Sequence, residues 1–168
     1  MSTIKREEID ALLSIIPRNF PILDIYHLTN DCQGLCIALH DICQAHGYNY
    51  DLCIENETYC EDIKHKTDLN PKNFKETKSR YNIQSRTYDF VFIMIDLHSL
   101  KNPELFYKKL YPISKNASKV LFIVEKDVDL RKLEDTLILH NYVATNPIED
   151  TFENYQILSA QKMHGWDN

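Results

Sequence analysis

The sequence predicts an α/β fold of three layers, in which helices cover both faces of a mainly parallel sheet that closes with an antiparallel strand pair. Helical patterns alternate with short apolar runs along the 168 residues, as is typical of parallel strands linked by crossover helices. The runs 88–97 and 118–126 are apolar almost throughout, as expected for strands covered on both faces. The runs 142–150 and 155–163 are joined by a short polar segment, which indicates an antiparallel pair.

The first part of the chain alternates helices and strands. Residues 4–16 have apolar side chains at helical spacing and predict a helix that Pro17 ends. The compact apolar run 20–28 favours a buried strand, and residues 34–48 then predict a helix with Gly47 as its C-cap.

The middle of the chain is less regular. Residues 50–57 predict a second strand that ends in the acidic residues Glu55 and Glu57, and residues 58–66 predict a short helix. The polar stretch 67–87 has a turn signal at Asn70 and Pro71 but no clear period. We therefore expect a third strand in this stretch without a defined position.

The pattern is strong again from residue 88 onward. The run 88–97 predicts a central strand, and Asp96 stands near its end. Residues 102–114 predict a helix, residues 118–126 a strand and residues 128–141 a further helix. The terminal strand pair then completes the sheet.

Length and composition indicate one globular domain. The chain has 43% hydrophobic and 26% charged residues, which is ordinary for a folded protein and too apolar for disorder. We expect a single domain over residues 1–168, with an N-terminal helix in 1–18 and an α/β core in 19–168. No apolar run reaches the roughly 18 to 20 residues of a membrane span, and residues 1–13 lack the apolar core of a signal peptide. A cytoplasmic protein without membrane contact is therefore expected.

The formal net charge of −6 disfavours nucleic acid as a partner, because a phosphate backbone is held by clustered cations. A local basic stretch lies within residues 72–86, and we interpret it as a solvated face. Its cations are Lys72, Lys75, Lys78, Arg80 and Arg86.

The cysteine pattern indicates reduced thiols, because the number is odd and no secretion signal is present. The five cysteines are Cys32, Cys36, Cys43, Cys53 and Cys60. Cys36, His40 and Cys43 would share one helix face at a spacing that suits a metal ion. Burial is the stronger interpretation, because cysteine behaves as a small hydrophobe and these positions lie among apolar residues. We therefore predict no metal site.

The fold class restricts where a ligand can bind. In a parallel sheet, ligands bind at the carboxyl ends of the strands, near the point where the strand order reverses. The candidate places are the chain positions that follow His27, Ile54, Ile95 and Val124.

Several stretches resemble the class I S-adenosylmethionine-dependent methyltransferases. ILDIYHLTNDCQG (22–34) is similar to that family's first strand and loop, and LCIENE (52–57) is similar to its acid-terminated second strand. Residues 88–126 are similar to its fourth strand, following helix and fifth strand, and the terminal strand pair also fits. The resemblance implies a Rossmann-like sandwich and S-adenosylmethionine as a small-molecule cofactor.

The first loop departs from the family's pattern. Asp24 occupies the place of the family's acidic residue, but Tyr26, Leu28 and Asn30 stand where glycines are expected. Such glycines let the backbone take a positive φ and approach the cofactor closely, and larger side chains oppose this. Gly34 is retained at the helix start. The polar residues before it are equally suited to cap an ordinary helix.

By resemblance, one group of residues faces the cofactor and another faces the methyl acceptor. The cofactor group is Asp24, Tyr26, Thr29, Gly34 and Glu55, and the acceptor group is Asp96 and His98. Glu55 would accept hydrogen bonds from ribose hydroxyls, with Glu57 as a rival. Asp96 would orient the acceptor, and His98 would act as a base. A solvated loop carboxylate and an incidental loop histidine are the alternatives.

Three hypotheses for the function follow from these observations. The first is an S-adenosylmethionine-dependent methyltransferase of unknown acceptor. The second is a catalytically inactive methyltransferase-like interaction or regulatory protein, in which Tyr26 and Leu28 fill the cofactor space. Trp166 would pack on the sheet or engage a partner such as a second copy in a homodimer. A thiol or metal enzyme built on Cys36 and its helix neighbours is the third and weakest hypothesis.

Overall fold

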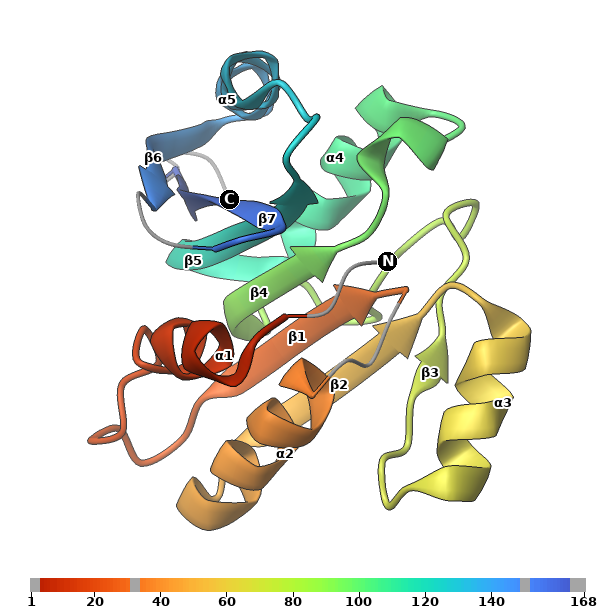
Figure 1. Cartoon of the computed structure of the whole chain (residues 1–168). Coiled ribbons are helices and arrows are strands. Elements are labelled where there is room, and N and C mark those ends of the chain that lie inside the picture. Colours follow the sequence, from red (N-terminus) through yellow and green to blue (C-terminus); the bar gives the residue numbers. More distant parts are fainter. Residues whose placement is uncertain (1–3, 31–33, 149–151, 164–168) are drawn as a thin grey trace.

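The computed structural model describes residues 4–30, 34–148 and 152–163. Seven strands form one sheet in the order β3-β2-β1-β4-β5-β7-β6, and β7 runs antiparallel to both of its neighbours (Figure 1). The predicted α/β fold with a C-terminal antiparallel strand pair is confirmed. Cys32 and Trp166 lie outside the described residues.

The order of helices and strands along the chain follows the sequence prediction closely. The strands are β1 (Asp24–Thr29), β2 (Asn49–Ile54), β3 (Lys72–Asn73), β4 (Tyr88–Met94), β5 (Ser114–Glu125), β6 (Tyr142–Ile148) and β7 (Tyr155–Lys162). The helices are α1 (Arg6–Leu13), α2 (Leu35–His46), α3 (Glu57–Lys66), α4 (Pro103–Leu110) and α5 (Leu130–Leu139), with 3-10 turns η1 (Leu97–Ser99) and η2 (Tyr111–Ile113).

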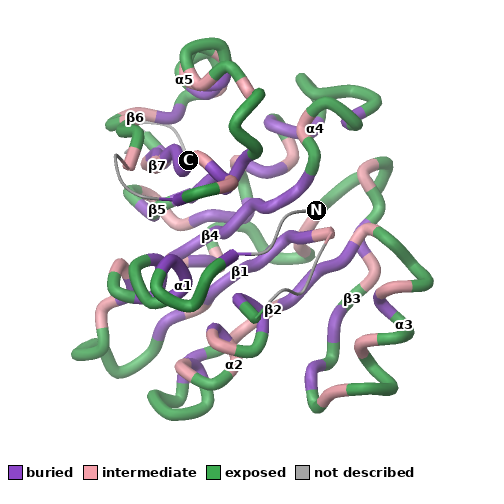
Figure 2. The backbone as a smooth tube through the Cα atoms, viewed as in Figure 1, coloured by how far each residue is buried: buried purple, intermediate pink, exposed green. Residues whose placement is uncertain are grey.

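The helices form layers on both faces of the sheet. Apolar residues of α1 and α2 pack in one core cluster with alternate residues of β1, β4 and β5. Residues of α4 and α5 pack in a second cluster against the opposite face, and α3 joins α2 over β2 in a third. Figure 2 shows the central strands buried along most of their length, while the outer sides of the helices are exposed. The predicted three layers are therefore confirmed.

Strand β1 lies at the centre of this arrangement. It pairs in parallel with β2 on one side and with β4 on the other, and its residues Ile25 to Thr29 are all buried. The strand order reverses between β1 and β4, because β2 and β3 follow on one side and β5 on the other. This reversal is where a parallel sheet opens a crevice for a ligand.

The weakly predicted third strand is very short. Strand β3 has only two residues, and residues 74–87 then run to β4 without a helix. Phe74 and Tyr81 from this stretch pack against each other and against Phe106 of α4, with ring centroids 4.7 to 6.5 Å apart. Apolar burial by two aromatic rings therefore orders a segment whose sequence has no period.

Several strand boundaries differ from the prediction, among them those of β1, β2, β4 and β5. Strand β1 begins at Asp24 and continues to Thr29, beyond the predicted end at residue 28, and β5 begins at Ser114 rather than at residue 118. The early start of β5 includes a bulge against β4. No helix in the described part of the chain is long and apolar enough to span a bilayer.

His27 is a buried polar residue in the middle of β1. Its side chain is fully buried, and its Nδ1 shares a hydrogen bond of 2.7 Å with the Tyr50 hydroxyl. Burial lowers the pKa of His27 from 6.5 to about 3. The folded protein therefore holds a neutral imidazole, whereas the unfolded chain takes up a proton below about pH 6.5.

We expect acid to destabilise the fold through His27. Because the folded pKa lies below the unfolded pKa, stability is lost as the pH falls from 6.5 towards 3, at about 1.4 kcal/mol per pH unit. Between pH 7 and pH 5 this group should remove about 2 kcal/mol from the free energy of unfolding. Urea unfolding of His27→Leu should lack this loss, whereas the same substitution at exposed His65 should retain it. Equal losses in wild type and His27→Leu would contradict the assignment.

Candidate functional site

The carboxyl ends of three neighbouring strands meet at one edge of the sheet. Thr29 of β1 pairs with Ile54 of β2 and with Met94 of β4, so these strands end level with one another. Because neighbouring strands lie about 4.8 Å apart, the residues that follow β2 and β4 are about 10 Å apart across β1. Figure 1 shows the arrowheads of β1, β2 and β4 directed to this edge. A ligand of moderate size could contact all three connections.

The connection from β1 to α2 requires a glycine at its end. The Asn30 N–H donates to the Met94 carbonyl at 3.2 Å, which ties the connection to β4. Gly34 has φ of +68° at the N-cap of α2, and a Cβ there would lie 3.1 Å from Cδ1 of Ile9. Both the positive φ and the contact from α1 favour glycine. Residues 31–33 of this connection lie outside the described residues.

Glu55 and Glu57 are the two candidates for the ribose-binding acid, and they differ in position at the end of β2. Asn56 caps α3 by accepting a hydrogen bond from the Tyr59 N–H at 3.0 Å, so Glu57 is the first residue of the helix and is exposed. Glu55 is partly buried and immediately follows β2. Its carboxylate is close enough to Tyr81 to raise the pKa of that phenol. Glu55 therefore has the better position at the strand edge.

Tyr81 and Glu76 lie near this edge and were not predicted from the sequence. The Tyr81 hydroxyl donates to the Glu76 carbonyl at 3.0 Å, and burial raises the pKa of Tyr81, with the Glu76 and Glu55 carboxylates adding to it. The Glu76 carboxylate also accepts hydrogen bonds from the N–H groups of Lys101 and Asn102 at 3.1 and 2.8 Å. It thereby ties the 74–87 stretch to the segment before α4. Neither residue was predicted, because the sequence of that stretch is polar and has no periodicity.

Asp96 and His98 occupy the turn after β4. An Asp96 carboxylate oxygen accepts a hydrogen bond from the His98 N–H at 3.0 Å, and the Asp96 carbonyl accepts one from the Ser99 hydroxyl at 2.7 Å. Asp96 therefore caps the 3-10 turn η1, and both Asp96 and His98 are exposed. The structure brings these two predicted residues to the same edge as Glu55.

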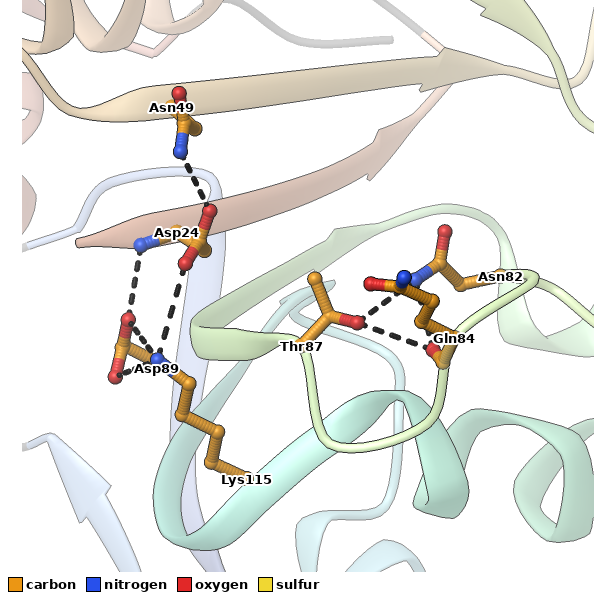
Figure 3. Close-up of polar contacts among 7 residues, drawn as sticks. All are labelled: Asp24, Asn49, Asn82, Gln84, Thr87, Asp89 and Lys115. Carbon is orange, nitrogen blue, oxygen red and sulfur yellow. Dashed lines mark hydrogen bonds and ion pairs between the residues drawn. The ribbon is translucent and has the colours of Figure 1, made fainter. Parts of the chain in front are cut away.

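The structure does not bring Asp24 to this edge. Asp24 is the first residue of β1, about 16 Å along the strand from its carboxyl end. Its carboxylate accepts a hydrogen bond from the Asn49 amide at 2.8 Å and lies 3.8 Å from the Lys115 ammonium (Figure 3). The resemblance placed Asp24 in the cofactor group, but β1 continues for five residues beyond it, so Asp24 lies at the other end of the strand.

The extension of β1 to Thr29 also affects the placement of Tyr26 and Leu28. Both lie inside β1 and face the α4 side of the core, with Tyr26 only 1% exposed and its ring centroid 5.0 Å from that of Tyr88. They are interior residues of the sheet rather than part of the loop, so the prediction that they take the places of loop glycines was wrong. Thr29, the last residue of β1, is at the edge and fully buried.

The residues of the alternative metal site pack as core residues. Cys36 belongs to the cluster between α2 and α3, and Cys43 belongs to the cluster under α1. Burial raises the pKa of Cys43 to about 12, which opposes the thiolate that a metal requires. Among the described residues, no group of three or more His, Cys, Asp or Glu side chains could hold a metal ion.

The fold is similar to those of solved methyltransferases. One is the CMeT domain of a citrinin polyketide synthase, with a TM-score of 0.71 and 12% identity over 92% of this chain and 50% of that chain. A second is a SAM dependent methyltransferase from Aquifex aeolicus, with a TM-score of 0.66 and 14% identity over 92% and 88% of the two chains. A third is phosphoethanolamine N-methyltransferase 2 from Haemonchus contortus in complex with S-adenosyl-L-methionine, with a TM-score of 0.68 and 10% identity over 94% and 53%.

These similarities define the class of fold. No family model and no curated protein sequence matches the chain, and the chain spans about half the length of the first matched structures. At identities of 7 to 14%, the likeness shows the fold alone. The chain has the class I S-adenosylmethionine-dependent methyltransferase-like fold.

We predict that Gly34→Ala destabilises the protein more than Gly47→Ala does. Both glycines have a positive φ, at +68° and +69°, which costs a residue with a Cβ about 1–2 kcal/mol. A Cβ at Gly34 also meets Ile9, whereas one at Gly47 meets nothing within 4 Å. Chemical denaturation should therefore show the larger loss for Gly34→Ala, and the excess should disappear in an Ile9→Ala background. Equal losses in the two backgrounds would contradict the contact.

Proposed function

We propose that this protein is an S-adenosylmethionine-dependent methyltransferase. The observation that carries the proposal is the placement of Glu55, Gly34 and Asp96 at one edge, on the three connections that flank the reversal of strand order. Crevices at such reversals bind nucleotide-like cofactors in parallel sheets. The similarity of the fold to solved methyltransferases supports the same assignment.

The residues present suit the parts of the cofactor. The Glu55 carboxylate would accept hydrogen bonds from the ribose hydroxyls, as acids at the end of a second strand do. The N-terminal N–H groups of α2, which follow Gly34 at the N-cap, would suit the carboxylate of the methionine part. Thr29 lies beside them at the end of β1. These residues replace the set that included Asp24 and Tyr26.

Asp96 and His98 would serve the methyl acceptor. The sulfonium of the cofactor supplies an activated methyl group, so the protein chiefly has to hold the acceptor in line with it. Asp96 would orient the acceptor atom from the turn η1, and His98 would remove its proton where one must be lost. We place the reaction in the cytoplasm, which the four buried free cysteines Cys36, Cys43, Cys53 and Cys60 support.

Replacement of Glu55 by Gln should weaken cofactor binding at least about tenfold, because charged acceptors make stronger hydrogen bonds than neutral ones. Isothermal titration calorimetry with S-adenosylhomocysteine measures this directly. Glu57→Gln is the matched control, since Glu57 lies two residues further along the chain and is exposed on α3. It should leave the affinity unchanged.

The outcome also separates the two functions. If S-adenosylhomocysteine and S-adenosylmethionine give no heat and no thermal shift at millimolar concentration, the protein is a methyltransferase-like module without the cofactor. If the cofactor binds and Glu57→Gln is the variant that weakens it, the site exists but Glu55 is the wrong acid.

A further inference from the structure

The amino edge of the sheet carries a pocket that the proposed function does not use. Its volume is about 360 Å³. It lies between the connection from α1 to β1 and the start of β5. The parallel strands begin at this edge, so the pocket is at the opposite edge of the sheet from Glu55.

One wall of the pocket is apolar and held in place. Phe20 and Ile22 line it and remain 53% and 63% exposed. The Tyr48 hydroxyl anchors this segment, because it lies 3.1 Å from the carbonyl oxygens of both Pro17 and Phe20. Large exposed apolar side chains beside a pocket favour a ligand with an apolar body.

The other wall is a bulge in β5. Residues 115–118 stand opposite the single residue Asp89 of β4, and Ala117 within the bulge has φ of +61°. This φ is uncommon for a residue other than glycine. Bulges and strained backbone of this kind gather at binding sites, because they aim side chains in directions that a regular strand does not allow.

A polar cluster fixes the bulge to the sheet (Figure 3). The Lys115 ammonium lies 3.0 and 3.1 Å from the two carboxylate oxygens of Asp89. The other Asp89 contact is the Asp24 N–H, which donates to it at 2.9 Å. The Asp89 carboxylate therefore already has a cation as its partner.

Two further groups at the pocket lack such partners. Ser118 lines the pocket and is 6% exposed, and its hydroxyl has no hydrogen-bond partner among the residues that the structure describes. Lys119 also lines the pocket and is exposed, and its ammonium forms no ion pair with any described residue. A cation without an ion-pair partner beside an apolar wall favours a ligand with an anionic group.

We infer that this pocket binds a small organic carboxylate with an aromatic or branched aliphatic body. The body packs against Phe20 and Ile22, and the carboxylate accepts a hydrogen bond from the Lys119 ammonium. An organic cation is disfavoured as the ligand, because the Asp89 carboxylate is already paired with the Lys115 ammonium. The site is separate from the cofactor edge and does not depend on the proposed function.

Three compounds with the same carbon skeleton test the ligand class: phenylacetate, 2-phenylethanol and 2-phenylethylamine. Amide NMR titration of the full chain should show phenylacetate binding with a Kd on the order of 1 mM, as expected for so small a ligand. The shifts should gather at Ile22, Phe90 and Lys119. The alcohol should bind about tenfold more weakly, because it lacks the charge-assisted hydrogen bond, and the amine should not bind.

Variants locate the contacts. Lys119→Gln should weaken phenylacetate about tenfold and leave the alcohol unchanged, because only the charged contact is lost. Ile22→Ser should weaken both compounds. Lys126→Gln is the matched control, since Lys126 is an exposed lysine just beyond the other end of β5, and it should change neither affinity. An unchanged pattern of dispersed amide signals shows that each variant is folded.

Four results would overturn the inference. The first is equal affinity for phenylacetate and 2-phenylethanol, and the second is an unchanged phenylacetate affinity in Lys119→Gln. The third is a set of shifts gathered at Glu55 and Asp96 instead of at the amino edge. Absence of binding by all three compounds at ten times the expected Kd would also overturn it.

Discussion

The parallel pairing of β1 with two neighbours is the constraint on which the rest of the structure depends. Every residue from Ile25 to Thr29 is buried, so the backbone groups of β1 must be satisfied by β2 and β4 on its two sides. The register then aligns Thr29 with Ile54 and with Met94. A slip of one residue would turn every β1 side chain to the opposite face. The level ends of these strands are thus a consequence of core packing.

The two edges of this sheet have different chemistry. At the carboxyl edge, Glu55 and Asp96 follow strands that flank β1, and α2 begins with its N-terminal N–H groups at the same edge. At the amino edge, Asp24 and Asp89 share the Lys115 ammonium, which compensates one of their two negative charges. The carboxylates at the amino edge are therefore engaged by a cation of the protein itself. The proposed cofactor site at the carboxyl edge agrees with the general position of ligand sites in parallel sheets.

Local patterns in the sequence predicted most of the helices and strands, but not where each strand begins and ends. The apolar run 88–97 identified β4 because both of its faces are covered, and Gly47 marked the end of α2 by its positive φ. Asp24 was placed in the cofactor group although it begins β1, because a fully buried strand has no alternation to show where it stops. Tyr26 and Leu28 were misplaced for the same reason.

Other features depend on contacts between distant segments and left no local signal. Tyr81 reaches the carboxyl edge because Phe74 and Phe106 pack against its ring. The bulge in β5 depends on Lys115 meeting Asp89, a residue 26 positions away. By contrast, Glu55 and Asp96 were predicted correctly as strand-end residues, because each follows a run whose end is marked by a polar residue.

Hydrogen–deuterium exchange with and without S-adenosylhomocysteine tests most directly that the reversal of strand order next to β1 forms the cofactor site. Binding should slow amide exchange at Asn30, Gly34, Glu55 and Asn56, at the carboxyl ends of β1 and β2. Exchange at the amino edge, at Asp89 and Lys115, should not change. Protection at the amino edge, or no protection anywhere at saturating ligand, would contradict it.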